Sequence, residues 1–247
     1  AEIYKKIKEN YFSIIIGTHA LFNKEISFMN LNLLIIDEEH KFGVRQKEQI
    51  RSLKNGINVI SLSATPIPRT LNLSLSKVRD ISLITTPPTG RKSVKTIVSR
   101  YSKSLVFEAI QREFYRDGQV FYLLNNVSML EEKKKEISDR FPGKTIAFAH
   151  GQLRPKELSK VMESFIRKEI DLLVCTTIIE SGIDIENANT LIVEESENYG
   201  LSQLHQIRGR VGRSKREAYA YFFLNENKEL KNKASERIEA LQENESL

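Results

Sequence analysis

Short apolar runs alternate with amphipathic stretches along most of the chain, and this alternation is the feature that most limits its fold. An unbroken apolar run is typical of a strand buried on both faces, as in a parallel sheet, whose strands are joined by helical crossovers. The sequence therefore predicts an α/β fold with mainly parallel sheets covered by helices. Strands are expected at 13–17, 33–36, 57–62, 81–84, 94–98, 119–124, 145–149, 172–175, 190–193 and 218–224, and helices at 1–12, 41–53, 69–75, 103–116, 128–140, 158–166 and 201–207.

The alternation is interrupted by a proline-rich connector at residues 85–92, Thr-Thr-Pro-Pro-Thr-Gly-Arg-Lys. Adjacent prolines cannot join a central strand, and they stiffen a linker. The connector predicts a first domain at 1–86 and a second at 87–224. A polar tail at 225–247 has apolar residues at helical spacing, which predicts one weakly amphipathic helix. These residues are Ala234, Ile238 and Leu241.

Composition excludes several classes of protein. Of the 247 residues, 40% are hydrophobic and 28% charged, and no apolar run approaches the roughly 18 residues that a membrane helix needs. Cys175 is the only cysteine, so an internal disulfide and a zinc-finger site are impossible. We expect a cytoplasmic protein without a membrane partner. The net charge of +6 is a mild indication of a polyanionic partner.

Acidic residues follow the apolar run 33–36 directly, in the order Asp37, Glu38, Glu39 and His40. Parallel sheets bind ligands at the carboxyl ends of their strands. One carboxylate there can hold Mg²⁺ beside nucleotide phosphates, and a second can orient or deprotonate an attacking water. A strand followed by a solvated acidic turn explains the same residues, so this stretch alone leaves both interpretations open.

An arginine-rich segment, Gln206 to Arg213, is the sharpest signal in the chain. Arginines at 208, 210 and 213 are interspersed with glycines at 209 and 212. The glycines allow close approach of the backbone, and guanidinium groups match phosphate oxygens in shape and charge. The pattern favours contact with phosphate over a solvated basic turn.

Polar residues also follow several other predicted strands. Hydroxyls, a glycine and an acid in 176–184 suit contact with phosphate and ribose, and Ser63 and Thr65 could bond the acids. An ordinary turn remains an alternative for each of these segments. The remaining candidates are Gly17, Thr18 and His19 as donors to phosphate, with a plain strand-to-helix turn as the alternative, and His150 as a contact to a nucleic-acid backbone, with a histidine that lines an interdomain surface as the alternative.

Three other features are predicted to be structural. Residues 142–145 contain Gly-Lys-Thr, but Ser138 stands where a phosphate-binding loop needs glycine, so a turn is expected. Cys175 is expected in the core. Residues 133–135, three consecutive lysines, are expected on a solvated helix face rather than on DNA.

Together these motifs resemble the two RecA-like lobes of a superfamily 2 helicase. Asp37–His40, Ser63–Thr65, 176–184 and Gln206–Arg213 follow the family's order. The finer resemblance is to the branch that contains the transcription-repair coupling factors and RecG. It rests on Gly-Thr-His-Ala-Leu at 17–21, Asp-Glu-Glu-His-Lys-Phe-Gly-Val at 37–44, Thr-Pro-Ile-Pro-Arg-Thr-Leu at 65–71, Thr-Thr-Pro-Pro at 85–88 and Gly-Leu-Ser-Gln-Leu-His-Gln at 200–206.

The resemblance implies a role for each matching residue, with ATP and Mg²⁺ as cofactors. Asp37 would bind the metal, Glu38 would activate water, and Arg210 and Arg213 would reach the γ-phosphate. Nucleotide contacts would come from Gly182, Asp184 and Gln206, and coupling of hydrolysis to movement from His40, Ser63 and Thr65. Nucleic acid would contact Gly17, Thr18, His19, His150, Thr176 and Thr177.

The chain departs from the family pattern in one respect, because no Gly-x-x-x-x-Gly-Lys-Thr/Ser loop occurs in it. We therefore expect an internal fragment of a longer enzyme, with a first lobe truncated at its N-terminus and little ATP hydrolysis by itself. The resemblance implies a monomeric, ATP-dependent double-stranded DNA translocase that displaces stalled RNA polymerase in DNA repair. A RecG-like enzyme that remodels forks and a non-catalytic nucleic-acid-binding protein are the alternatives.

Overall fold

The computed structural model describes residues 2–23, 26–38, 42–53, 56–63, 93–176 and 185–226, together with residues 80, 82, 84, 86, 237, 240 and 241. The chain divides into two compact units, Ala1–Ile81 and Ser82–Leu247. The helix expected at 69–75 lies outside the described residues. None of the described helices is long and apolar enough to span a membrane.

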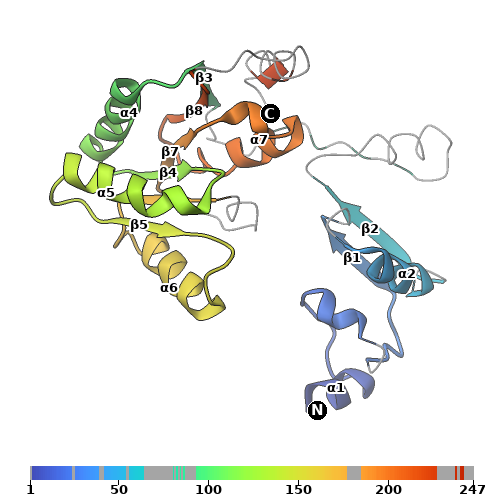
Figure 1. The fold of residues 1–247 in the computed structure, drawn as a ribbon. Coiled ribbons are helices and arrows are strands. Elements are labelled where there is room, and N and C mark those ends of the chain that lie inside the picture. The colour runs from blue at the N-terminus through green and yellow to red at the C-terminus, as the bar shows by residue number, and fades with distance from the viewer. Residues whose placement is uncertain are drawn as a thin grey trace. The chain divides into compact units, whose positions relative to one another are not determined.

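Among the described residues of the first unit, β1 (Leu33–Asp37) and β2 (Asn58–Leu62) form a two-stranded parallel sheet (Figure 1). In this sheet Ile35 lies opposite Ile60. The predicted strands at 33–36 and 57–62 and the helix at 41–53 are confirmed to within a few residues. The described elements are α1 (Glu2–Lys8), a 3₁₀ turn (His19–Phe22), β1 (Leu33–Asp37), α2 (Val44–Leu53) and β2 (Asn58–Leu62).

Two predictions for this unit are wrong. Residues 13–17 form no strand, and Ile14 and Ile16 are 80% and 93% exposed. Branched side chains favour a strand only where a neighbouring strand completes its hydrogen bonds, and the described residues supply none here. β1 is not buried on both faces either, because Ile36 is 3% exposed whereas Ile35 is 58% exposed. Neighbouring residues of a strand face opposite sides, and the residues that the structure describes cover only the side to which Ile36 points.

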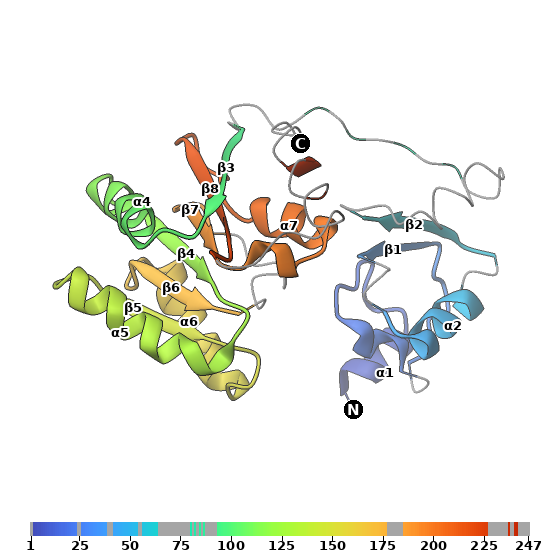
Figure 2. The same ribbon diagram turned by 45° about the horizontal axis from the view of Figure 1, so that its top comes forward.

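The second unit is built on a six-stranded sheet with the order β3-β8-β7-β4-β6-β5 (Figures 1 and 2). All of its strand pairs are parallel, which confirms the predicted α/β class. The strands are β3 (Val94–Arg100), β4 (Gln119–Leu123), β5 (Ile146–Ala149), β6 (Leu172–Cys175), β7 (Ala188–Val193) and β8 (Ala218–Leu224), and the helices are α4 (Lys103–Tyr115), α5 (Leu130–Arg140), α6 (Pro155–Ile166) and α7 (Leu201–Arg208). The strand expected at 81–84 is not present at its described residues, Ser82 and Ile84.

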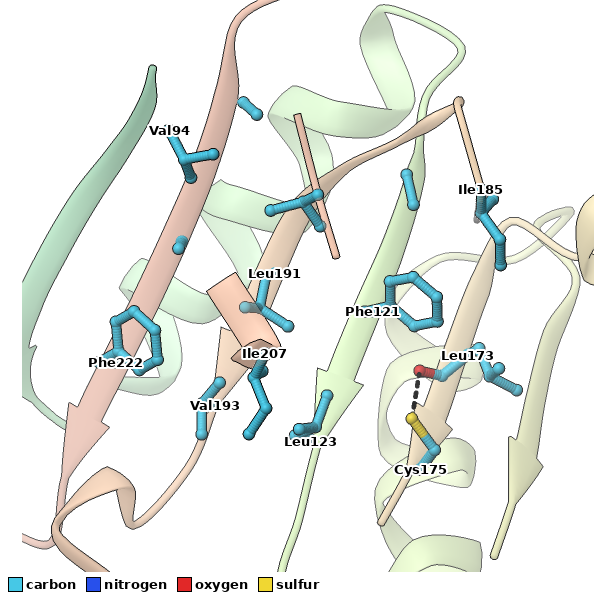
Figure 3. Packing of buried hydrophobic residues seen from close by; sticks show 14 of the residues in the cluster. Val94, Phe121, Leu123, Leu173, Cys175, Ile185, Leu191, Val193, Ile207 and Phe222 are labelled. Atoms are coloured by element: carbon cyan, nitrogen blue, oxygen red, sulfur yellow. Dashed lines mark hydrogen bonds between the residues drawn. The ribbon is translucent and has the colours of Figure 1, made fainter. Parts of the chain in front are cut away.

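Apolar side chains fill both faces of this sheet, because successive strand residues point to opposite sides. Phe121, Leu173 and Cys175 lie on the face covered by α6 and α7 (Figure 3), so Cys175 is a core residue as predicted. Tyr122, Val174 and Phe223 lie on the face covered by α4 and α5. Burial raises the pKa of the Cys175 thiol, which keeps it protonated and unreactive.

Local hydrogen bonds define the start of one predicted helix and one predicted turn. The helix expected at 128–140 begins at Leu130, after a 3₁₀ turn that is capped by the Asn126 side chain, which accepts a hydrogen bond from Ser128 N (3.0 Å). The expected turn at 142–145 is confirmed, and Gly143 takes a positive φ of 89° that favours glycine. Asp171 accepts bonds from Lys144 Nζ (3.1 Å) and Thr145 N (2.8 Å), so this lysine has a structural partner.

Candidate functional site

The predicted acidic residues lie at the carboxyl end of the first unit's sheet. Asp37 is the last residue of β1 and lies opposite Leu62 of β2. Glu38 N donates to Leu62 O (3.0 Å), and Glu38 takes a left-handed φ of 53°. This backbone conformation is unfavourable for residues other than glycine, and the hydrogen bond from Glu38 N to β2 helps to stabilise it. The chain of β2 continues into Ser63, so the two polar segments leave the sheet at the same edge.

Asp37 fits the ligand set that Mg²⁺ prefers beside a nucleotide. Asp37 is exposed, whereas Glu38 is half-buried. Among the residues that the structure describes, no three His, Cys, Asp or Glu side chains gather into a possible metal site. Magnesium in nucleotide sites is commonly held by one or two carboxylates together with phosphates and water, so one accessible carboxylate is sufficient. Glu39, His40 and Thr65 lie outside the described residues.

The Gly17–His19 segment forms an exposed turn in the first unit. Thr18 Oγ1 accepts a bond from Ala20 N (3.4 Å) and caps the short 3₁₀ turn that starts at His19. A Cβ atom on Gly17 would lie 2.8 Å from the Leu21 side chain, so local packing alone explains this glycine. The exposed backbone and the His19 ring are accessible to a polyanion.

The arginine-rich segment divides into structural and accessible arginines. Arg208, the last residue of α7, is 2% exposed and donates to Leu241 O (3.1 Å) and Thr96 Oγ1 (3.3 Å). The prediction that all three arginines are offered to phosphate is therefore wrong for Arg208, which joins α7 to β3 and to the C-terminal segment. Arg210 is half-buried and Arg213 is exposed.

A glycine and a hydrogen bond define the position of Arg213. Gly212 takes a positive φ of 75°, which turns the backbone immediately before the arginine and favours glycine at this position. Arg213 Nε donates to Gly209 O (3.3 Å), so the guanidinium group is tied to its own loop. Gln206, the predicted nucleotide contact, is half-buried on α7 one turn before this loop.

His205 gives the second unit a predicted pH dependence. Burial and the neighbouring Arg208 lower the pKa of His205 from its usual 6.5, and Arg208 Nη2 lies 3.2 Å from His205 Nδ1. Below about pH 6.5 the unfolded chain binds a proton that the folded chain does not, so stability falls as the pH is lowered. We expect the free energy of unfolding, measured with urea from pH 7 to 5, to fall less steeply in a His205→Asn variant. Parallel curves would contradict this expectation.

Candidate residues of the second unit lie together at the carboxyl ends of β5 and β6. Ala149 pairs with Cys175, so His150 and Thr176 leave the sheet side by side. The His150 ring stacks on Phe148 with a centroid distance of 6.1 Å. The geometry brings together two residues that were predicted from separate motifs. Thr177, Gly182 and Asp184 lie outside the described residues.

A network around Lys133 was not predicted from the sequence. Lys133 Nζ lies 3.0 Å from both Glu136 Oε2 and Glu194 Oε1, and it donates to Tyr101 OH (3.1 Å). Tyr122 OH also donates to Glu194. The solvated face predicted for the lysine run is thus wrong for Lys133, whereas Lys135 is exposed as predicted. The only sequence signal was that Lys133 lies one turn before the inward-facing Ile137.

Two family models match this chain. The DEAD/DEAH box helicase family matches residues 1–73, and the helicase conserved C-terminal domain matches residues 103–215. Transcription-repair-coupling factors of Staphylococcus epidermidis and Staphylococcus haemolyticus are each 50% identical to it over 242 residues, 98% of this chain and 21% of each relative. The chain therefore spans about a fifth of the length of these curated relatives.

Solved helicase structures share the fold. RecG bound to a three-way DNA junction aligns with a TM-score of 0.74 and 34% identity, covering 98% of this chain and 32% of RecG. Dbp5 of S. cerevisiae, bound to RNA and ADP BeF3, aligns with a TM-score of 0.61 and 14% identity over 98% of this chain and 60% of Dbp5. At that identity the second match supports the fold alone.

Proposed function

Because this chain belongs to the superfamily 2 helicases, we propose that it is the motor core of an ATP-dependent double-stranded DNA translocase that displaces stalled RNA polymerase during DNA repair. One observation carries the proposal: the 50% identity to transcription-repair-coupling factors extends over 242 residues and includes both helicase segments. The complete protein would act in the cytoplasm, with a monomeric motor.

We further propose how the residues share the chemistry. Asp37 would hold Mg²⁺, and Glu38 would orient and deprotonate the attacking water. Arg210 and Arg213 stabilise negative charge that develops on the γ-phosphate. The metal supplies charge neutralisation when bound. The remaining roles are nucleotide contact by Gly182, Asp184 and Gln206, coupling by His40, Ser63 and Thr65, and nucleic-acid contact by Gly17, Thr18, His19, His150, Thr176 and Thr177.

The 247-residue chain by itself is proposed to turn over little ATP, because its sequence contains no glycine-rich loop with the lysine that holds phosphates. Robust DNA-stimulated hydrolysis by this chain would contradict that part of the proposal.

The proposed function is tested with the full-length protein and RNA polymerase stalled on duplex DNA. ATP is expected to release the polymerase, and Glu38→Gln should reduce release by about 10² or more because a general base contributes about that factor. Glu48→Gln, a matched change at an exposed residue of α2, should leave release intact. The parent protein and the two variants should bind duplex DNA with similar affinity. This result would place the defect of Glu38→Gln in ATP hydrolysis and not in DNA binding.

A RecG-like function is the second candidate, because RecG resembles this chain at 34% identity. The same full-length protein is then given a branched DNA junction without polymerase. Remodelling of the junction without release of stalled polymerase would favour the RecG-like function over the proposal.

A further inference from the structure

The second unit contains a pocket of about 600 Å³ that the predicted helicase chemistry does not use. Its lining comes from the start of β4, the end of α6, and the segments that lead into β7 and β8. These segments place it at the amino ends of the parallel strands. His150 and Thr176 follow the carboxyl ends of β5 and β6, at the opposite edge of the same sheet.

The pocket combines an apolar wall with two cations. Ile166 is 50% exposed, and Ile185, which is buried, lines the same pocket. Lys168 and Arg216 are both exposed and line the same pocket, together with one acid, Glu186. An exposed isoleucine beside two cations matches a partner that carries an apolar group next to a negative one.

Lys168 occupies a backbone position that favours glycine. It follows the C-terminus of α6, takes a left-handed φ of 63°, and donates from its N–H to Phe165 O (3.1 Å). Glycine is common after a helix because this conformation has no Cβ penalty there. A lysine is therefore less favourable than glycine for the backbone here, and this lysine lines the pocket.

Arg216 is held in place by the fold. Its Nη1 donates to Arg116 O (2.7 Å), and its backbone N donates to Ser214 Oγ (3.2 Å). The Ser214 hydroxyl in turn donates to Asn189 Oδ1 (2.7 Å) on β7. A guanidinium group anchored in this way loses little conformational freedom when it binds an anion.

We propose that this pocket binds an extended acidic peptide segment of a partner protein. An apolar side chain of the segment covers Ile166, and a neighbouring carboxylate lies between Lys168 and Arg216. The Glu186 carboxylate accepts a hydrogen bond from a backbone N–H group of the same segment, and this bond sets the direction in which the segment runs. Two cations against one acid give the lining a net positive charge, so an acidic segment is preferred over a basic one.

Binding to the 247-residue chain is measured by fluorescence polarisation with the peptide Ala-Asp-Leu-Glu-Ala, which carries the fluorescent label on its N-terminal amine and is amidated at its C-terminus. Lys168→Gly and Arg216→Gln should each weaken binding at least fivefold. Lys160→Ala, which removes an exposed charge from the same helix, should change it less than twofold. The matched peptide Ala-Lys-Leu-Lys-Ala should bind at least fivefold more weakly than the acidic one.

The proposal is overturned if the acidic peptide does not bind, if the two peptides bind equally well, or if both pocket variants bind the acidic peptide as tightly as the parent chain does. If a short single strand of DNA competes with the peptide and binds the Lys168→Gly variant more weakly, the ligand of this pocket is nucleic acid and not an acidic peptide. Lys168→Gly removes an unfavourable φ, so its thermal midpoint should match or exceed that of the parent chain, which excludes unfolding as the cause of weaker binding.

Discussion

Replacing Arg213 by alanine in the full-length protein is expected to lower DNA-stimulated ATP hydrolysis by about 10³-fold, while duplex DNA affinity changes only a few-fold. Arg213 is exposed, follows the sharp turn at Gly212, and is tied to Gly209 O through Nε. In its proposed role Arg213 would stabilise charge that develops on the γ-phosphate only in the transition state, so its loss should affect turnover more than binding.

Two further variants separate charge from geometry. Lys215→Ala removes an exposed cation two residues further on and should leave the ATPase rate nearly unchanged. Arg213→Lys keeps the charge but loses the planar fork, so it should rescue only a small part of the rate. Equal losses of DNA affinity and ATPase in Arg213→Ala would identify Arg213 as a DNA contact instead.

Replacing Lys133 by methionine is expected to destabilise the second unit by about 3 kcal/mol, because it removes the cation that pairs with the largely buried Glu194 carboxylate. Glu136, in contrast, keeps Lys103 as a partner. The side chains of Lys133 and Glu194 are 11% and 13% exposed, so solvent screens their interaction little. Burial alone would lower the pKa of Lys133, but Glu194, Glu136 and Tyr101 outweigh it and raise this pKa above its usual range. Burial and Glu194 also raise the pKa of Tyr122.

The measurement is urea unfolding of the 247-residue chain at neutral pH, followed by circular dichroism. Lys135→Met provides the matched control on α5, because Lys135 is exposed and its loss should change stability by no more than about 0.5 kcal/mol. Similar unfolding midpoints for Lys133→Met and the parent chain would show that the network adds no stability beyond that of an apolar side chain in its place.

Local patterns in the sequence predicted the second unit well. Its strands are short, apolar and separated by amphipathic helices, and each strand and helix predicted between residues 94 and 224 corresponds to an observed element within a few residues. The helix predicted in the tail lies mostly outside the described residues. The same reasoning failed at 13–17, where three consecutive isoleucines form no strand. Apolar residues signal a need for burial, but a strand also needs a partner for its hydrogen bonds, and the sequence pattern does not reveal that partner.

The candidate site shows a similar division between what local patterns predict and what they miss. The order of the motifs predicted that Asp37, Glu38, Arg210 and Arg213 would carry polar chemistry, and the structure places Glu38 beside the end of β2 through its bond to Leu62. The pattern of alternating arginines and glycines could not distinguish Arg208 from its neighbours. Arg208 is buried because the helical position of its side chain directs it towards Thr96 and Leu241.

The sequence by itself determined the α/β class, the parallel sheet of the second unit and the family to which the motifs belong, since these depend on local periodicity and on residue order. Only the tertiary structure decided which charged residues are structural. Lys133 pairs with Glu194 across 61 positions, and Arg208 bonds Thr96 from 112 positions away. The contacts that neutralise or solvate a charge depend on segments far apart in sequence, so the roles of these side chains are fixed only when the chain folds.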